Sequence, residues 1–173
     1  MSQSSSPGDS VQVVFNTSPL VFLAKLGYLE IFLDDEMVFW VPQSVAIELT
    51  AKTDTASDKI QQLISSERLQ VRQSRLSSLT NGLQRKLGSG ESEAISLAIE
   101  LNADYVLLDD AAARREAMQL RLIVRGTLAV VRKMMAEGKV DSLSLEDLYR
   151  RLQNINFRIK RSVFDQIFSD LPF

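Results

Sequence analysis

The chain has no cysteine and no histidine among its 173 residues. The missing cysteine excludes disulfides and thiolate metal sites, and the missing histidine excludes imidazole acid–base chemistry and Ser–His or Cys–His nucleophilic pairs. Any chemistry must therefore use carboxylates, hydroxyls, amides, lysine or arginine. The lack of disulfides costs little stability, because a domain of this size buries about 70% of the surface that its unfolded chain exposes.

Long apolar segments are also missing. No run approaches the roughly 18 apolar residues of a membrane span, and the N-terminus lacks the charged and apolar regions of a signal peptide. The composition, with 45% hydrophobic and 24% charged residues, is typical of one soluble globular domain. We therefore expect a cytoplasmic protein that does not contact a membrane.

The net charge of −2 hides an asymmetry along the chain. Residues 1–110 carry 8 basic and 15 acidic side chains, a net charge of −7, whereas residues 111–173 carry 12 and 7, a net charge of +5. An acidic part that can gather divalent cations thus precedes a basic part that can hold an anionic polymer. Two solvated faces of opposite sign would give the same totals.

The spacing of apolar residues predicts an α/β fold. Short apolar runs predict strands at 13–15, 38–41, 69–71, 105–108 and 122–124. Helical spacing predicts helices over 20–32, after Pro42, around 60–64, over 91–101, from Arg114 to Leu120 and over 127–137. Such alternation favours a three-layer α/β/α domain with a central, mostly parallel sheet of about five strands.

The ends of the chain differ from this core. Residues 1–10 are rich in Ser, Gly and Pro, and we expect a disordered leader. The α/β domain would occupy residues 11–140. Residues 141–173 predict one or two amphipathic C-terminal helices that form an extension. This extension would pack either on its own domain or on a partner, which could be a second copy of the chain.

Polar residues follow two of the predicted strands. In an open parallel sheet, ligands collect outside the carboxyl ends of the strands. Asn16, Thr17 and Ser18 follow the first strand, and Asp109 and Asp110 follow the fourth. These five residues are therefore candidates for one shared site.

Two helices add glutamates. Glu91 shares a helix face with the apolar positions that follow it, whereas Glu93 and Glu100 point the other way and are expected to face solvent. Glu48 lies beside the apolar stripe of the helix after Pro42. Four separate elements thus direct oxygen-bearing side chains toward one end of one sheet.

Each candidate also has a structural explanation. Glu91 could stabilise a helix dipole, and Asp109-Asp110 could provide a turn and an N-cap. Glu48 could lie at the edge of a surface helix, and the residues from Asn16 to Ser18 could cap the helix after them. Only the coincidence of four such groups at one edge favours a functional site.

Clustered carboxylates favour a bound cation, because like charges at close range raise each other's pKa. Ligand sets made only of oxygen select hard cations such as Mg²⁺ or Mn²⁺. Such a cation can activate water and stabilise a phosphoryl oxygen without histidine. Hydrolysis of a phosphodiester is consistent with this residue inventory.

Several motifs together resemble a PIN domain. The matching strings are Val14-Phe15-Asn16-Thr17-Ser18-Pro19-Leu20, Lys25-Leu26-Gly27, Val41-Pro42 with Val45 and Glu48-Leu49, Gly90-Glu91-Ser92-Glu93-Ala94-Ile95-Ser96-Leu97-Ala98, Leu107-Leu108-Asp109-Asp110 and Gly126-Thr127-Leu128. Their order and spacing agree over about residues 12–140. The closest resemblance is to a prokaryotic PIN-like subgroup described as nucleic acid-binding.

The resemblance implies a metal-dependent ribonuclease that uses Mg²⁺ or Mn²⁺ and acts on RNA. The toxins of toxin–antitoxin pairs are prokaryotic examples of the family, so an antitoxin protein is an implied partner. Carried over by position, the four acidic residues of the family fall on Asn16, Glu48, Glu91 and Asp109. Asp110 is an additional candidate ligand, and Thr17 or Ser18 would supply a hydroxyl near the metal.

The departure from the family pattern is Asn16, where active nucleases of the family carry Asp. Asn keeps one oxygen that can bind a cation but removes one negative charge, which weakens metal affinity. Three outcomes follow: an enzyme whose metal is held by Glu48, Glu91 and Asp109, a weak enzyme, or a PIN-like module that only binds nucleic acid or protein.

Contacts to substrate are less specific in the sequence. Arg114 and Arg115 follow the acidic strand end and are candidates for phosphate contacts, together with Arg121, Arg125, Arg132 and Lys133. Ordinary solvation of helix surfaces is the slightly favoured explanation for any one of them. The aromatic residues Phe39 and Trp40 lie inside a predicted strand and are expected in the core.

Overall fold

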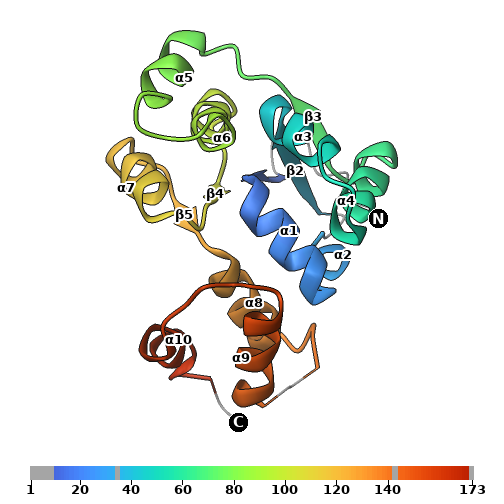
Figure 1. Cartoon of the computed structure of the whole chain (residues 1–173). Coiled ribbons are helices and arrows are strands. Elements are labelled where there is room, and N and C mark those ends of the chain that lie inside the picture. Colours follow the sequence, from blue (N-terminus) through green and yellow to red (C-terminus); the bar gives the residue numbers. More distant parts are fainter. Residues whose placement is uncertain (1–9, 34–35, 142–143, 172–173) are drawn as a thin grey trace, which may run out of the picture.

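A single parallel sheet organises the molecule. The computed structural model describes residues 10–33, 36–141 and 144–171 (Figure 1). The strand order is β3-β2-β1-β4-β5, and every neighbouring pair is parallel. The strands are β1 (Val11–Phe15), β2 (Met37–Pro42), β3 (Gln70–Arg72), β4 (Tyr105–Leu107) and β5 (Val124–Arg125). The predicted central sheet is confirmed, and nine of the ten residues of the expected leader lie outside the described residues.

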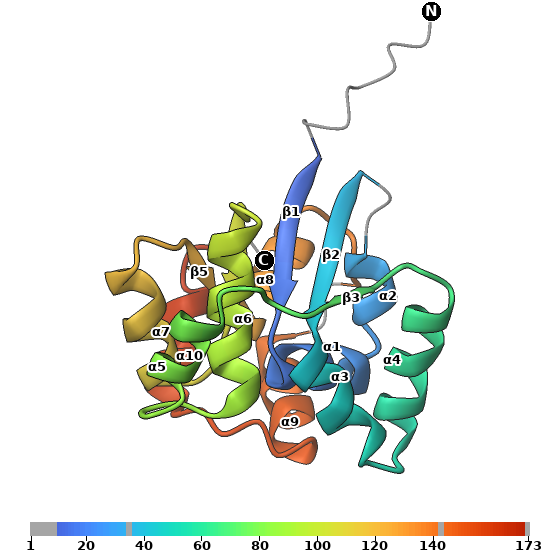
Figure 2. The same cartoon turned by 90° about the horizontal axis from the view of Figure 1, so that it is seen from above.

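Helices cover both faces of the sheet, as Figures 1 and 2 show. Alternation along β1 sends Val13 and Phe15 into one core and Val14 into the other. The first core is covered by α1 (Thr17–Leu26), α2 (Leu29–Phe32), α4 (Thr55–Ser65), α8 (Thr127–Ala136), α9 (Leu145–Asn154) and α10 (Arg161–Phe168). The second is covered by α5 (Ser77–Leu83), α6 (Ser89–Glu100) and α7 (Ala111–Gln119). The three-layer α/β/α architecture is confirmed.

The helix α3 (Gln43–Thr50) links the two sides of the sheet. Its buried residues Val45 and Leu49 belong to the first core, while the helix itself packs beside α6. Pro42 is the last residue of β2 and also precedes the first turn of α3, where its fixed φ suits the entry into a helix. The turn after β2 therefore delivers α3 directly to the carboxyl edge of the sheet.

The first predicted helix, over 20–32, is divided in two. Gly27 adopts a left-handed φ of 77°, and its N–H donates to Ala24 O at 3.0 Å. The Tyr28 N–H donates to Leu23 O at 2.9 Å, which completes a Schellman-type end. Apolar residues keep their helical spacing through this turn, so periodicity alone predicts one helix where the structure has two.

Some boundaries also differ. The helix α5 lies in a segment rich in Ser and Thr and was not predicted, because Leu83 is its one buried residue and leaves little apolar periodicity. The helix α6 begins at Ser89, so Gly90 lies within its first turn instead of before it. The last strand is Val124–Arg125, shifted toward the C-terminus from the apolar run at 122–124.

The prediction that Glu93 and Glu100 face solvent is wrong. Glu93 is 7% exposed, and its carboxylate accepts the backbone N–H groups of Ser44 at 2.7 Å and Ser74 at 3.1 Å. The face of α6 that carries Glu93 is covered by α3 and by the segment after β3, so this face is not open to water.

Glu100 anchors the segment between β3 and α5. Its side chain is 7% exposed and accepts from the Arg75 side chain and backbone, both at 2.7 Å, and from the Ser74 hydroxyl at 3.1 Å. These hydrogen bonds, the Arg75 side chain first, lower the pKa of Glu100 to about 2. The carboxylate thus fixes the connection that covers α6.

The C-terminal helices make extensive contacts with their own domain. Phe164 and Phe168 of α10 are fully buried in the first core. The Arg151 guanidinium donates to Leu26 O at 2.7 Å and to the Tyr28 hydroxyl at 3.1 Å. These contacts hold α9 and α10 against the face that carries α1 and α8.

The two aromatic residues of β2 have different environments. Phe39 is 2% exposed and lies in the core as expected. Trp40 is only half-buried, and its indole N–H donates to Gln12 Oε1 at 2.6 Å. Among the helices of the described residues, none combines the length and apolar character needed to cross a membrane.

Candidate metal and nucleic-acid site

The carboxyl ends of β1 and β4 are neighbours, which brings two polar segments together. The Asn16 N–H donates to Leu107 O at 3.1 Å and extends the β1–β4 pairing to the start of α1. Asp109 and Asp110 leave the end of β4 at the same edge. The first turn of α6 and the last turns of α3 lie beside them. Side chains from distant parts of the sequence therefore meet at one edge.

Gly90 lies against two of the candidate ligands. A Cβ atom at this position would lie 2.8 Å from Glu48 Oε1 and 3.2 Å from Asn16 Oδ1. The space that any larger residue would fill is thus bounded by these two oxygen atoms and by Val45 Cγ2, also 3.2 Å away. The Thr17 hydroxyl donates to the other Glu48 oxygen, Oε2, at 2.5 Å and fixes the orientation of this carboxylate.

Glu91 combines a structural and an electrostatic role. Its carboxylate accepts the Gly88 N–H at 3.1 Å, so it forms part of the cap of α6. Burial raises the pKa of Glu91, the Gly88 hydrogen bond lowers it, and the negative charges of Asp110 and Glu48 raise it further. Glu91 is therefore close enough to Asp110 and to Glu48 to be repelled by each of them.

Asp109 is held by the helix that follows the neighbouring strand. Its Oδ1 accepts the Thr127 N–H at 2.8 Å and its Oδ2 accepts the Thr127 hydroxyl at 2.6 Å. Burial raises the pKa of Asp109, whereas these hydrogen bonds and the nearby Arg114 charge lower it. A Cβ at Gly126 would lie 2.9 Å from Arg114 Nη1 and 3.2 Å from Asp109 Oδ1, so the chain is tightly packed here too.

Asp110 serves as the N-cap of α7. Its Oδ1 accepts the Ala113 N–H at 2.9 Å, as the structural explanation anticipated. The residue is exposed, and its charge acts on Glu91 across the edge of the sheet. The cap uses one carboxylate oxygen and leaves the other free to bind a ligand.

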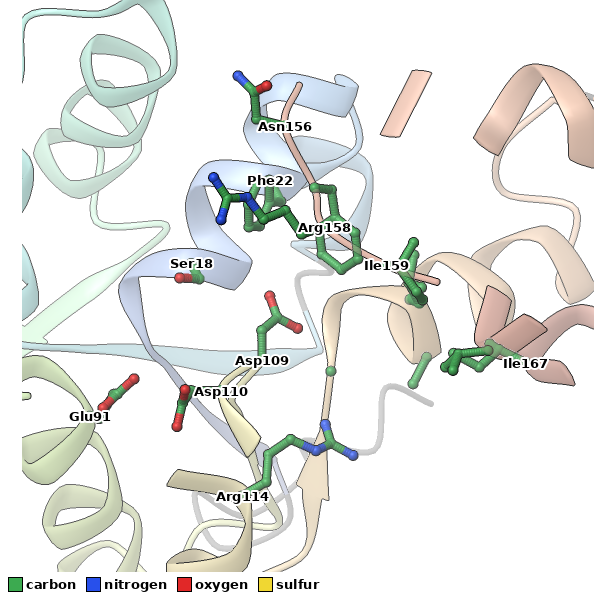
Figure 3. Close-up of a pocket in the computed structure, with 15 residues that line it drawn as sticks. Ser18, Phe22, Glu91, Asp109, Asp110, Arg114, Asn156, Arg158, Ile159 and Ile167 are labelled. Atoms are coloured by element: carbon green, nitrogen blue, oxygen red, sulfur yellow. The ribbon is translucent and has the colours of Figure 1, made fainter. Parts of the chain in front are cut away.

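A pocket of about 810 Å³ opens at this edge (Figure 3). Glu91, Asp109 and Asp110 line one side of it, with Ser18 and Arg114 nearby. The remaining lining residues are Phe22, Gly126, Leu128, Ala129, Asn156, Phe157, Arg158, Ile159, Val163 and Ile167. The pocket therefore has an acidic side and an apolar side. Its two arginines are Arg114 of α7 and Arg158 of the segment between α9 and α10.

The predicted residues are only partly brought together. Asn16, Thr17 and Glu48 form one group beside Gly90, whereas Asp109 and Asp110 belong to the pocket lining, with Glu91 between the two groups. Within residues 10–33, 36–141 and 144–171, no three acidic side chains are close enough to hold one ion as they stand. Arg115 is exposed on α7 and is not one of the residues that line the pocket.

Part of the pocket was not predicted from the sequence. Its apolar side comes from Phe22 of α1 and from the segment between α9 and α10, which includes Phe157, Arg158 and Ile159. No local pattern marks these positions, since only the folded chain brings residue 157 next to residue 22. The sequence Phe-Arg-Ile-Lys at 157–160, apolar and basic in alternation, is the one signal that was present.

The residue types at this edge fit a hard divalent cation. The donors are carboxylate, amide and hydroxyl oxygens, as Mg²⁺ and Mn²⁺ prefer. Gly90 leaves the space into which the side-chain oxygens of Asn16 and Glu48 both extend. Burial is the main cause of the raised pKa of Glu91, and the added repulsion from Asp110 and Glu48 is the kind that a bound cation relieves.

The fold and the acidic edge together define a nuclease-like three-layer domain. The family comparison agrees: residues 12–171 match a family model described as a PIN domain. This match covers nearly the whole chain, including both C-terminal helices, and the chain belongs to the PIN domain family. No curated protein gives a match. Proteins with PIN domains generally bind nucleic acids.

Proposed function

We propose that this protein is a Mg²⁺- or Mn²⁺-dependent ribonuclease that hydrolyses phosphodiester bonds of RNA. The observation that supports this proposal is that Asn16 Oδ1 and Glu48 Oε1 both lie against Gly90, with Glu91 in the next position of the same helix. Burial and, to a smaller extent, the negative charges of Asp110 and Glu48 raise the pKa of Glu91, and a bound cation would offset this repulsion.

The chain's own residues have separable roles in this proposal. Asn16, Glu48, Glu91, Asp109 and Asp110 are the candidate metal ligands. When bound, the cation supplies a Lewis acid for a phosphoryl oxygen and makes water nucleophilic at neutral pH. Thr17 orients Glu48, and Thr127 orients Asp109, through the hydrogen bonds described above. Arg114 contributes positive charge at the pocket wall, where a phosphate would enter.

Cleavage of a labelled single-stranded RNA with Mn²⁺, with Mg²⁺ and with EDTA tests the proposal. The wild type should cleave with either metal and not with EDTA. Glu48→Gln should lose most of the cleavage, whereas Glu30→Gln should retain it, because Glu30 is exposed and pairs with Lys59 away from the pocket. Cleavage by Glu48→Gln at the wild-type rate would contradict the proposed ligand set.

A second candidate is a PIN-like module that binds nucleic acid or protein without catalysis. Two observations favour it: Asn16 is neutral, and no three acidic side chains of the described residues lie close enough to share one ion. Asn16→Asp separates the two candidates, because a metal enzyme should keep or gain activity when the charge is added. A protein that is inert with either residue, but binds RNA, is a binding module.

A role as the toxin of a toxin–antitoxin pair is a further part of the proposal. It predicts that induced expression of the wild type arrests the growth of a bacterial host. The Glu48→Gln variant should allow growth when it accumulates to the same level. Equal growth with both proteins would contradict a toxic ribonuclease activity.

A further inference from the structure

The C-terminal segment between α9 and α10 forms one wall of the pocket. Residues 156–159 line it together with Val163 and Ile167 of α10. Figure 3 shows Arg158 and Ile159 across the pocket from Glu91 and Asp110. The ribonuclease proposal uses only the acidic side, so this wall has no role in it so far.

The wall is held in place by specific contacts. The ring of Phe157 meets that of Phe22 edge-to-face, with centroids 4.8 Å apart. The Phe157 N–H donates to Leu152 O at 2.9 Å, and Asn156 takes a left-handed φ of 60°, which Asn tolerates better than most residues. The aromatic pair is therefore preorganised and does not need to form when a ligand binds.

The chemistry of this wall is mixed. Phe22 and Phe157 are each half-buried, so both rings keep surface that a ligand can cover. Arg158 is exposed, and within the described part of the chain its guanidinium makes no ion pair. A ligand that fits must offer a flat, weakly polar group to the phenyl rings and a negative charge to the arginine. An unpaired nucleotide offers both.

We propose that Phe157 and Phe22 form a subsite for an unpaired nucleobase of RNA, and that Arg158 binds a phosphate next to that base. This inference rests on the proposed function, because it assigns the position of the substrate in the same pocket. Aromatic faces accept any base, so the subsite selects for single strands and not for a sequence. The volume of about 810 Å³ lies within the usual range of ligand pockets, about 300–1,000 Å³.

Arg158 and Arg114 lie on different sides of the pocket. Arg114 belongs to α7 and donates to Leu108 O at 3.0 Å, so it is held near the end of β4. Arg158 comes from the C-terminal wall and is the more exposed of the two. A phosphodiester chain that passes between them would place one phosphate at the acidic side and the next at Arg158. The base between these phosphates would then meet the phenyl rings.

An abasic scan tests the base subsite directly. Fluorescence anisotropy in a buffer that contains calcium would measure binding of a single-stranded octaribonucleotide and of versions that lack one base at each position in turn. A gel run afterwards would check that the RNA still has its full length. For the wild type, loss of one particular base should weaken binding at least about fivefold, the lower end of the effect of a stacked aromatic. In Phe157→Leu, loss of the same base should have less than half that effect, because the stacking partner is already gone.

Further variants keep the test decisive. Phe157→Tyr retains the ring and should bind like the wild type, and Phe22→Leu provides a second route to the same loss if Phe157→Leu unfolds.

The phosphate contact is tested by the salt dependence of binding. Arg158→Gln should reduce by about one the slope of log affinity against log salt concentration. Arg85→Gln, which changes an exposed arginine outside the pocket, should leave this slope unchanged.

The outcomes separate this inference from the proposed function. Equal penalties at every position in wild type and Phe157→Leu would overturn the base subsite even if the RNA is cleaved in Mn²⁺. A position-specific penalty without cleavage would support the subsite and contradict the ribonuclease. Equal affinity for a fully paired duplex, or no RNA binding by the wild type, would overturn the subsite and direct attention to a peptide ligand.

Discussion

Gly90 and Glu48 approach so closely that position 90 cannot carry a side chain without moving the glutamate: a Cβ would lie 2.8 Å from Glu48 Oε1. The glycine is not needed for its backbone conformation, because it lies within helix α6, where alanine is preferred. The glycine therefore serves the position of a carboxylate.

Gly90→Ala should separate folding from function. The new methyl group would push Glu48 and Asn16 apart, and a misplacement of about 1 Å in a catalytic group can reduce a rate about 100-fold. Gly82→Ala is the matched control, since a Cβ there meets nothing within 4 Å in the helix α5. Metal binding by calorimetry and thermal unfolding would be compared. Unchanged Mn²⁺ affinity in Gly90→Ala would exclude a ligand role for the group around Gly90.

Asn16→Asp should change stability in opposite directions with and without metal. An added carboxylate beside Glu48 destabilises the metal-free protein by repulsion. If the charge lowers the dissociation constant for Mn²⁺ tenfold, saturating metal adds about 1.4 kcal/mol of stability, or about 3–5 °C in Tm. Differential scanning fluorimetry with a Mn²⁺ series would measure both. Asn81→Asp, on exposed α5, should show no added response to metal.

Glu91→Gln should stabilise the metal-free protein at neutral pH. The folded pKa of Glu91 is raised, chiefly by burial, so this carboxyl favours folding below its unfolded pKa and loses that contribution as the pH rises through the folded pKa. Gln removes the charge and can still accept the Gly88 N–H. The gain in Tm should therefore be present at pH 7 and vanish near pH 4, while Mn²⁺ affinity falls. A variant less stable than wild type at pH 7 would contradict this electrostatic account.

Two substitutions at Asp110 distinguish a cap from a ligand. Asp110→Ser keeps a side-chain acceptor for the Ala113 N–H, whereas Asp110→Ala removes it and should reduce stability by about 0.5–2 kcal/mol. If the carboxylate binds metal, both variants should lose Mn²⁺ affinity to a similar extent. Urea unfolding and metal titration would be measured on the same samples. Wild-type metal affinity in Asp110→Ser would show that Asp110 acts only as a cap.

Glu100→Gln should weaken the fold away from the site. Its pKa of about 2 means that its contribution is present above the unfolded pKa and is lost as the pH falls toward 2. Loss of the hydrogen bonds that Glu100 accepts from Arg75 and Ser74 should lower the free energy of unfolding by about 1–3 kcal/mol at pH 7 and by much less near pH 2. Glu137→Gln, at exposed pairs with Lys139 and Lys133, should change stability by less than about 1 kcal/mol. Chemical unfolding as a function of pH would show the difference.

Sequence patterns predict the fold well and the site less completely. Alternation of short apolar runs with helices leads to the parallel sheet, and the carboxyl-edge rule identifies Asn16 and Asp109 as neighbours. The roles of Glu93 and Glu100 were mistaken because a helical wheel shows opposite faces but not whether a second layer covers them. For Asp109, hydrogen bonding to Thr127 depends on the packing of α8, which no local spacing encodes.

The C-terminal wall has a consequence for biosynthesis. The last strand of the sheet ends at Arg125, but the pocket wall begins only at Asn156. In a nascent chain, the strands and the acidic edge are therefore synthesised before the wall. If the proposed ribonuclease activity needs this wall to hold RNA, a partly made chain would not capture RNA of the particle that synthesises it until Phe157 has packed against Phe22.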